Sequence, residues 1–392
     1  MTQNFVMRYI FIFILLALPG KSLFAQALTA INFRELYNPE SEISITLQPV
    51  STSQKVEIFY QIQSNQTRLD KYSITWEKRE SYTQREGTPL TNTDSISLAN
   101  TIKGLWVFDV PAKPWLLVAK VTNIETKKSW VHFKMIEKNF PVNGWFEQDN
   151  NRLTKKYLIA DQPYPVKSKI NGNILFVSYY NEDFPAAYPP FAEKESNVDR
   201  FLFHDSIFQI STGSPVTLKK TGLYLFQKDT AASEGVAVRV VNKSFPRFSK
   251  IEDLMKPLIF VCTQDEYTAL QNAKGDKAKF DKVVLDITRD KEKAANFMKS
   301  YFRRVELANL YFSSFKEGWK TDRGMIYLIF GLPDEVSMND SNETWHYNNT
   351  RARFTFVKSG SVYDPENYVL LRDKRFMEPW FSTVDLWRKS RF

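Results

Sequence analysis

The sequence has very few of the residues that usually build a reactive centre. Its 392 residues include one cysteine, Cys262, and three histidines, His132, His204 and His346. A single cysteine excludes a disulfide within the chain, and no two histidines have the spacing of metal ligands. The sequence also has no glycine-rich phosphate loop, no Gly-x-Ser-x-Gly elbow and no Cys/His pair. We therefore expect no cofactor, no metal and no enzymatic activity.

Long apolar runs are also scarce, and the one at the N-terminus predicts export. Arg8 precedes an apolar run from Tyr9 to Leu18, and Leu23-Phe24-Ala25 follows. This pattern is typical of a secretory signal peptide cleaved after Ala25, with an uncleaved anchor as the alternative. No later segment is long enough to cross a bilayer, so we expect no transmembrane span after cleavage. Without a cysteine at the cleavage site, we do not expect a lipoprotein.

Aromatic residues, by contrast, are abundant. The chain has 31 Phe, 18 Tyr and 9 Trp, and 43% of its residues are hydrophobic. This composition excludes general disorder and favours aromatic-rich β structure. The excess of basic residues is modest and spread along the chain, so it permits contact with an anionic envelope surface. There is no dense Lys/Arg block or stacking motif for nucleic acid.

Length and local patterns divide the chain into a signal peptide and three domains. The predicted boundaries are 1–25 for the signal peptide, 26–138 for an immunoglobulin-like β-sandwich, 139–247 for a second β-rich domain and 248–392 for an α+β domain. In the first domain, about seven short strands alternate with polar turns, as in antiparallel sandwiches. In the second, strands are predicted at Ile174–Tyr180, Ser206–Ile210, Leu223–Gln227 and Val236–Val241.

The proline-rich stretch Asp183–Pro190 cannot join a β-ladder, because proline lacks the backbone N–H. We expect it to be a long exposed loop. Such loops often bind partners, although a plain crossover between strands has the same composition.

Helix signals dominate the third domain. Ser249–Glu252 and Thr263–Glu266 both have the capping-box pattern that starts helices. Between them, Leu258–Cys262 reads as a short buried strand that holds Cys262 as a small apolar residue. Apolar residues recur on one stripe from about Lys291 to Glu317, which predicts a long helix buried on two sides.

The stretch after this helix concentrates special residues. Gly318 is expected to stop the helix in a left-handed conformation. Thr321–Gly324 has turn composition, Met325–Phe330 is apolar on both faces and is expected to be a central strand, and Gly331–Glu335 is a second turn. Alternating segments follow at Glu343–Tyr347, Arg353–Val357 and Tyr368–Leu371. These predict a four-stranded antiparallel meander packed against the helices, an α+β arrangement.

This stretch resembles a known family. Gly318–Gly324 followed by Ile326–Glu335, with Tyr301–Asn309 upstream and Glu343–Tyr347 downstream, is similar to the signature of the GWxTD domain of bacterial envelope proteins, typical of Bacteroidota. The resemblance covers about residues 250 to 390. It implies an envelope location and an α+β domain, and it brings no catalytic residues.

A fainter likeness concerns the order Gly-x-Pro-Asp, Trp-x-Tyr and Phe-x-Phe. It is similar to small lipoproteins that assist outer-membrane β-barrel assembly and bind partners. This sequence departs from them in lacking a lipid-attachment cysteine and in placing a long hydrophobic segment before the Gly-x-Pro.

The motif and the segments after it provide the candidate site. The residues expected to form the motif or a docking surface are Gly318, Trp319, Thr321, Asp322, Arg323, Gly324, Gly331, Pro333, Asp334, Trp345 and Tyr347. Arg304 is the arginine of the long helix best placed for burial. Because a buried charge must be paired, we expect an Arg304–Asp322 ion pair that fixes the helix to the sheet.

Three functions are compatible with the sequence. The first is an exported, non-enzymatic scaffold or docking component of an envelope machine for secretion, gliding or outer-membrane assembly, in the periplasm or at the periplasmic face of the outer membrane. Its partners would be envelope proteins, possibly an outer-membrane complex. The second is an envelope enzyme or binding protein for glycan or peptide; as an enzyme it would use Asp334, Glu335, Glu343 and His346. The third is carbohydrate binding through exposed Trp106, Trp115 and Trp130.

Overall fold

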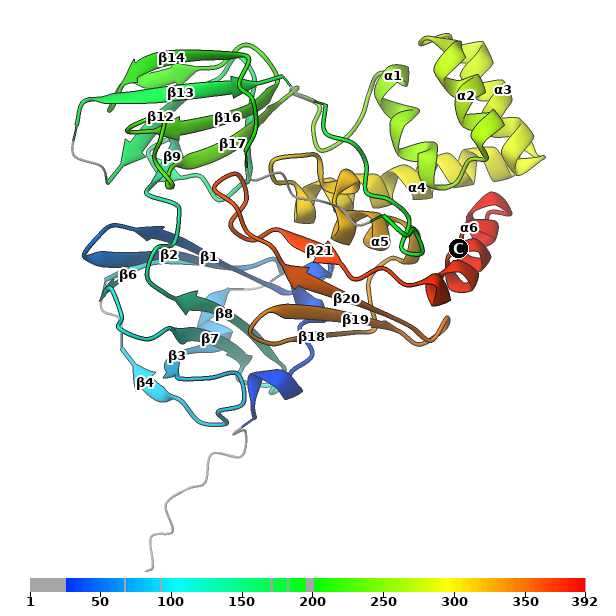
Figure 1. Cartoon of the computed structure of the whole chain (residues 1–392). Helices are drawn as coiled ribbons and strands as arrows, with labels where there is room; N and C mark the ends of the chain where they lie inside the picture. The colour runs from blue at the N-terminus through cyan, green and yellow to red at the C-terminus, as the bar shows by residue number, and fades with distance from the viewer. Residues whose placement is uncertain are drawn as a thin grey trace, which may run out of the picture.

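The structure is a computed structural model that describes residues 26–66, 68–91, 94–169, 172–181, 183–194 and 201–391. The predicted signal peptide lies outside the described residues. Within those residues, no helix has both the length and the apolar character needed to span a membrane. Figure 1 shows two β-rich parts on one side of the molecule, the C-terminal helices on the other, and the sheet β18–β21 between them.

The first β-rich part consists of two four-stranded sheets, ordered β1-β2-β6-β5 and β4-β3-β7-β8. The strands are β1 Ile43–Ser51, β2 Lys55–Ser64, β3 Tyr72–Arg79, β4 Thr88–Leu90, β5 Ser95–Leu98, β6 Thr101–Asp109, β7 Trp115–Asn123 and β8 Ser129–Ile136. Short 3-10 turns lie at Leu28–Ala30, Arg34–Tyr37 and Leu69–Lys71. The inner faces of the two sheets share one apolar core that includes Ile58 and Val121.

This core also holds the three tryptophans that were candidates for carbohydrate binding. Trp106, Trp115 and Trp130 are buried between the sheets, and Trp106 contacts Trp76 edge to face. The prediction that they form an exposed row is therefore wrong. Burying a large aromatic side chain is worth more to a sandwich than leaving it on the surface.

The second β-rich part also contains two sheets, ordered β10-β9-β12-β15 and β11-β17-β16-β13-β14. Their strands are β9 Gly144–Gln148, β10 Asn151–Arg152, β11 Tyr157–Ile159, β12 Pro163–Ser168, β13 Ile174–Tyr180, β14 Ser206–Ser211, β15 Pro215–Thr217, β16 Gly222–Gln227 and β17 Val236–Val241. The pairing is antiparallel except between β11 and β17. Strands β13 and β17 have the predicted bounds, whereas β9 to β12 and β15 had no clear alternation and were missed.

The C-terminal part is a layer of helices on a meander sheet ordered β18-β19-β20-β21. Its elements are α1 Ile251–Leu254, a 3-10 helix Lys256–Phe260, α2 Gln264–Ala273, α3 Lys277–Thr288, α4 Lys291–Phe312, a 3-10 helix Gly318–Lys320, α5 Asp322–Phe330, β18 Glu335–Met338, β19 Asn342–Tyr347, β20 Ala352–Lys358, β21 Tyr368–Leu370, a 3-10 helix Lys374–Phe376 and α6 Met377–Arg388. The predicted class, β domains followed by an α+β domain, is confirmed.

The predicted central strand Met325–Phe330 is wrong, because these residues form α5. Thr321 caps this helix: its Oγ1 accepts a hydrogen bond from the backbone N–H of Gly324 at 3.0 Å. Asp322 follows in the first turn, where a carboxylate favours the helix N-terminus. The helix packs against α4, β21 and α6, so it is apolar on every side and lacks the helical periodicity that would have revealed it.

Other local predictions were tested as well. The capping box at Thr263 is confirmed, whereas α1 begins after Lys250 with no side-chain cap. Leu258–Cys262 is not a strand, because the chain forms a 3-10 helix at Lys256–Phe260. The long helix α4 ends at Phe312, before the predicted stop at Gly318.

Strand β7 joins the first sandwich to the C-terminal part because both of its faces are buried. Leu117, Ala119 and Val121 point into the sandwich core. Leu116 and Val118 point the other way, into the core of the C-terminal part. A strand apolar on both faces is the pattern expected for a central layer between two cores.

Candidate functional site

Two glycines of the motif stand where the chain passes closest to itself. A Cβ atom on Gly318 would lie 2.0 Å from the carbonyl oxygen of Ala308 on α4. A Cβ atom on Gly324 would lie 1.8 Å from the carbonyl oxygen of Gly318. No side chain fits at either position, so the first turn of α5 lies directly on the backbone that precedes it.

Trp319 and Lys320 are both buried between these glycines. The Trp319 indole N–H donates to Glu317 at 3.0 Å. The Lys320 ammonium pairs with Glu317 at 3.4 Å and also with Asp183 of the second β-rich part. The lysine inside the motif therefore connects it to a segment far away in sequence.

That segment is the proline-rich stretch Asp183–Pro190, which we call the strap. The backbone N–H of Ala187 donates to the Lys320 carbonyl at 2.9 Å. The Arg372 guanidinium donates to the Tyr188 carbonyl at 2.9 Å, and the Asp373 N–H donates to the Pro190 carbonyl at 3.0 Å. Phe184, Ala187 and Pro190 are buried. The expected long exposed loop is thus bound to its own C-terminal part.

Asp322 forms the most buried ion pair of the site. Its Oδ1 lies 2.6 Å from Arg372, and each side chain is only 3% exposed. Its Oδ2 accepts the backbone N–H of Leu370, on β21, at 2.9 Å. One carboxylate therefore fixes the start of α5 to the last strand of the sheet.

The predicted Arg304–Asp322 ion pair is wrong. Arg304 lies over the Trp387 ring at 5.4 Å and close against Gly331, where a Cβ atom would meet its guanidinium. Burial lowers the pKa of Arg304. Its charge is stabilised by the aromatic face, and Asp322 is directed instead to an arginine later in the chain.

Arg323 links the motif to the N-terminal segment. It pairs with Glu343 at 3.0 Å and donates to the Tyr37 hydroxyl at 3.3 Å. Its guanidinium also lies 4.3 Å from the centre of the Tyr368 ring. Burial, and after it the Glu343 charge, raises the pKa of Tyr37 well above its usual value, so the phenol remains neutral. Tyr37 itself packs between Phe312 and Trp345.

The four acid–base candidates do not form one site. Asp334 and Glu335 are exposed, whereas Glu343 is buried and accepts the Trp345 indole N–H at 2.6 Å. His346 lies opposite Glu335 in the β18–β19 register, on the other face of the strand from Glu343. Across the described ranges, no cluster of His, Cys, Asp and Glu could hold a metal ion.

The remaining docking candidates are also internal. Trp345 and Tyr347 are buried in the core, and the Tyr347 hydroxyl donates to the Gly331 carbonyl at 2.8 Å. Pro333 is buried as well, and only Asp334 of the docking candidates is exposed. The motif is therefore a junction inside the molecule, and it offers little surface to a partner.

The C-terminal part of the chain matches a protein family. Residues 222–389 match the family model of the GWxTD domain. The chain carries a GWxTD domain. The match begins at Gly222, the first residue of β16, and so includes the last two strands of the second β-rich part. Arg239 on β17 contacts the chain just before the motif, since its guanidinium donates to the Phe315 carbonyl at 3.0 Å.

Other comparisons add little. No curated protein matches the chain. Among solved structures, a chimeric titin Z1Z2-Z1Z2 tandem carrying a GRGDS peptide from fibronectin is similar at 8% identity and a TM-score of 0.18, over 51% of this chain and 99% of that one. At that TM-score the likeness carries no argument.

Sequence reasoning missed the residues that complete the junction of the GWxTD domain. Asp183, Arg372 and Tyr37 all contact the motif from distant parts of the chain. No local pattern marks them, because a contact across so many residues leaves no periodicity. The only available signal was chemical: three charged residues in a buried motif each require a partner.

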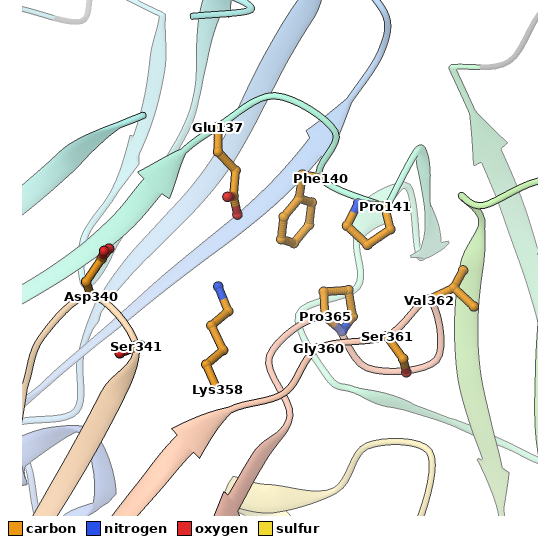
Figure 2. A pocket seen from close by; sticks show the side chains of 10 residues that line it. All are labelled: Glu137, Phe140, Pro141, Asp340, Ser341, Lys358, Gly360, Ser361, Val362 and Pro365. Atoms are coloured by element: carbon orange, nitrogen blue, oxygen red, sulfur yellow. The ribbon is translucent and has the colours of Figure 1, made fainter. Parts of the chain in front are cut away.

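A cavity of about 510 Å³ lies where the GWxTD domain meets the end of the first sandwich. Figure 2 shows the Lys358 ammonium directed towards Glu137, with Asp340 at the side and the Phe140, Pro141 and Pro365 rings forming an apolar wall. The neighbouring Lys134 forms an ion pair with Glu366. Burial alone would raise the pKa of Glu366, but Lys134 and other lysines hold it well below its usual value.

Proposed function

We propose that the chain is an exported, non-enzymatic scaffold of the cell envelope, a component of a secretion, gliding or outer-membrane assembly machine. The observation that carries the proposal is the buried junction at the motif. Lys320, Asp322 and Arg323 each pair with a charge from a different segment: Asp183, Arg372 and Glu343. The Lys320–Asp183 pair binds the second β-rich part to the GWxTD domain, and the other two pairs fix the start of α5 within that domain. A scaffold requires parts held in fixed positions in this way.

The charged residues of the junction favour a structural role over a catalytic one. A catalytic group needs access to substrate and a pKa matched to its task. Asp322 and Arg372 are enclosed, and Glu343 is 1% exposed. Paired and enclosed in this way, the charges favour one geometry of the GWxTD domain.

The proposed place is the periplasm or the periplasmic face of the outer membrane. The signal-peptide pattern supports export. Partners would then bind outside the motif, on exposed surface of the GWxTD domain such as Phe381 on α6, which is 54% exposed.

Affinity purification of the tagged chain from gently crosslinked envelopes tests the proposal. We expect one envelope protein in constant ratio, identified by mass spectrometry. Phe381→Glu should reduce its recovery, whereas Leu285→Glu, at an exposed apolar position of α3, serves as the matched control. Recovery of the chain alone from several growth conditions would contradict the scaffold function.

A second candidate function is binding of an envelope peptide or glycan, and the cavity beside Lys358 favours it. Charged groups on an apolar wall are typical of small-molecule sites. Ligand-observed NMR with a set of muropeptides and glycan fragments tests it. We expect signal loss that Lys358→Glu abolishes and that Lys282→Glu, at an exposed position of α3 that does not line the cavity, leaves unchanged. No signal loss with any fragment would reject this function.

A further inference from the structure

Strand β14 is almost wholly exposed, and at six residues it is longer than β5, the four-residue edge strand that shares this exposure. It is the last strand of its sheet, and it pairs only with β13 among the described strands. Of its residues only Ile210 is partly buried. Figure 1 shows β14 at the outer margin of the second β-rich part, away from the first sandwich and from the helices.

The exposed side chains at this edge are apolar. Ile207 and Phe208 on the strand are each about two-fifths exposed, and Phe201 and Phe203 just before it are 90% and 97% exposed. Ile207 and Phe208 lie on opposite faces of the strand, so apolar side chains flank the free edge on both sides. An unprotected edge of this kind favours pairing with another strand.

The edge also lacks the usual features that prevent pairing. Natural edge strands are protected by lysine, proline, a bulge or a covering segment. Strand β1, another edge, contains Pro49, and its Gln48 side chain is bonded to the Leu153 carbonyl of the following domain. Strand β14, Ser-Ile-Phe-Gln-Ile-Ser, contains neither proline nor charge.

The backbone geometry shows which groups point outward. The Thr212 N–H donates to the Asn173 carbonyl of the β13 side at 2.9 Å. In an antiparallel ladder the bonding residues alternate, so Ile210 and Phe208 also bond to β13. The N–H and C=O groups of Ile207, Gln209 and Ser211 therefore point to the free edge.

We infer that β14 pairs antiparallel with β14 of a second copy of this chain, about a two-fold axis at Gln209. The outward residues are symmetric about Gln209, so this register places Ile207 opposite Ser211 of the second copy and Gln209 opposite its own equivalent. Every outward backbone group then finds a partner. A two-fold axis at Phe208 would leave Ser211 opposite Asp205, whose N–H is already bonded to Tyr179.

The side chains fit the same register. Phe208 lies opposite Ile210 of the second copy, and this aromatic–β-branched cross-strand pair occurs twice. The two Gln209 amides can bond each other, and no charge on one strand meets a charge on the other. This isologous pairing would join two five-stranded sheets into one.

A disulfide placed on the axis tests the register directly. In the full chain with Cys262→Ala, Gln209→Cys should form an intermolecular disulfide under mild oxidation, because directly opposed residues have Cα atoms about 5.5 Å apart. Ser97→Cys, on the exposed edge strand β5, is the matched control and should remain a monomer on a non-reducing gel.

Light scattering after size exclusion tests the assembly without a cysteine. The wild-type chain should have twice the monomer mass, Ile207→Lys should halve it, and Ile96→Lys, at an exposed position on β5, should leave it unchanged. Hydrogen exchange at Ile207, Gln209 and Ser211 should be slow in the dimer and fast in Ile207→Lys.

A wild-type monomer would overturn the inference, and so would a dimer in which Gln209→Cys does not crosslink. Protection of the β14 amides only after another envelope protein is added would assign the edge to a different chain and would also overturn it. The inference is independent of the proposed scaffold function, since either can fail while the other holds.

Discussion

Two ion pairs of this protein have the same nitrogen–oxygen distance and lie in opposite environments. Arg372 and Asp322, at 2.6 Å, are each 3% exposed, whereas Lys55 and Asp109, also at 2.6 Å, are 50% and 86% exposed. The first joins α5 to a segment beyond the sheet. The second bridges neighbouring strands of the first sandwich. The nitrogen–oxygen distance alone does not measure how much an ion pair contributes to stability. Water competes for the charges of the exposed pair but not for those of the buried pair.

The largest effect should come from breaking the buried pair. Asp322→Ala leaves the Arg372 guanidinium enclosed without its carboxylate and removes the acceptor of the Leu370 N–H. We expect a loss of about 3–5 kcal/mol in the free energy of unfolding, measured by urea denaturation. Arg372→Ala should cost a similar amount, and the double variant should cost clearly less than the sum of the two. Additive costs would mean that the two side chains act independently.

Gly324→Ala should give the next largest change in stability. Its sign should be opposite to that of the same substitution in an ordinary helix. In an open helix this change stabilises by about 1 kcal/mol. Here the new Cβ meets the Gly318 carbonyl oxygen, so we expect destabilisation of about 1–3 kcal/mol. Thermal unfolding measures it, with Lys299→Ala on the exposed side of α4 as the control. A more stable variant would show that the junction can open without cost.

A pH dependence of stability is expected from one histidine of the first sandwich. Burial, and after it the nearby Lys134 charge, lowers the pKa of His132 on β8 to about 4. The unfolded chain therefore binds a proton near pH 6.5 that the folded chain does not bind until about pH 4. Stability is complete above pH 6.5 and falls between these two values, by at most about 3 kcal/mol.

His132→Gln should remove this fall while leaving the loss at lower pH, where carboxylates with lowered pKa values such as Glu266 become protonated. Urea unfolding at a series of pH values from neutral to acid checks this. Parallel curves for the wild type and the variant would show that His132 is solvated in the folded state.

The smallest effect is expected at the exposed pair. Asp109→Ala should change the free energy of unfolding by less than about 1 kcal/mol, because solvent screens the Lys55 interaction. The difference should shrink further in high salt. A loss comparable to that of Asp322→Ala would remove the distinction between the two regions.

Elements with one buried face and one solvent-exposed face were predicted well from the sequence. Strand β2 alternates and α4 shows its apolar stripe, because each borders both a core and solvent. Helix α5 was mistaken for a strand for the complementary reason. Met325 to Ile329 are all buried, so neither the period of a strand nor that of a helix is visible.

The candidate site could be predicted only as a set of residues without their partners. The motif was recognisable from Gly318 to Gly324, and the need to pair its charges followed from burial. The choice between Arg304 and Arg372 did not, since Arg372 is 50 residues beyond Asp322. Similarly, nothing near Lys320 indicates Asp183, which lies 137 residues before it.

By itself the sequence determined the order of the domains, the β-sandwich alternation, the long helix and the GWxTD motif, because these depend on local periodicity and spacing. Only the tertiary structure decided what the motif does. It buries Trp319, directs Asp322 to Arg372 and binds the strap to the motif. The physical reason is that burial and proximity in three dimensions select the partner of a charge. Neither quantity can be predicted from the residues next to that charge in the sequence.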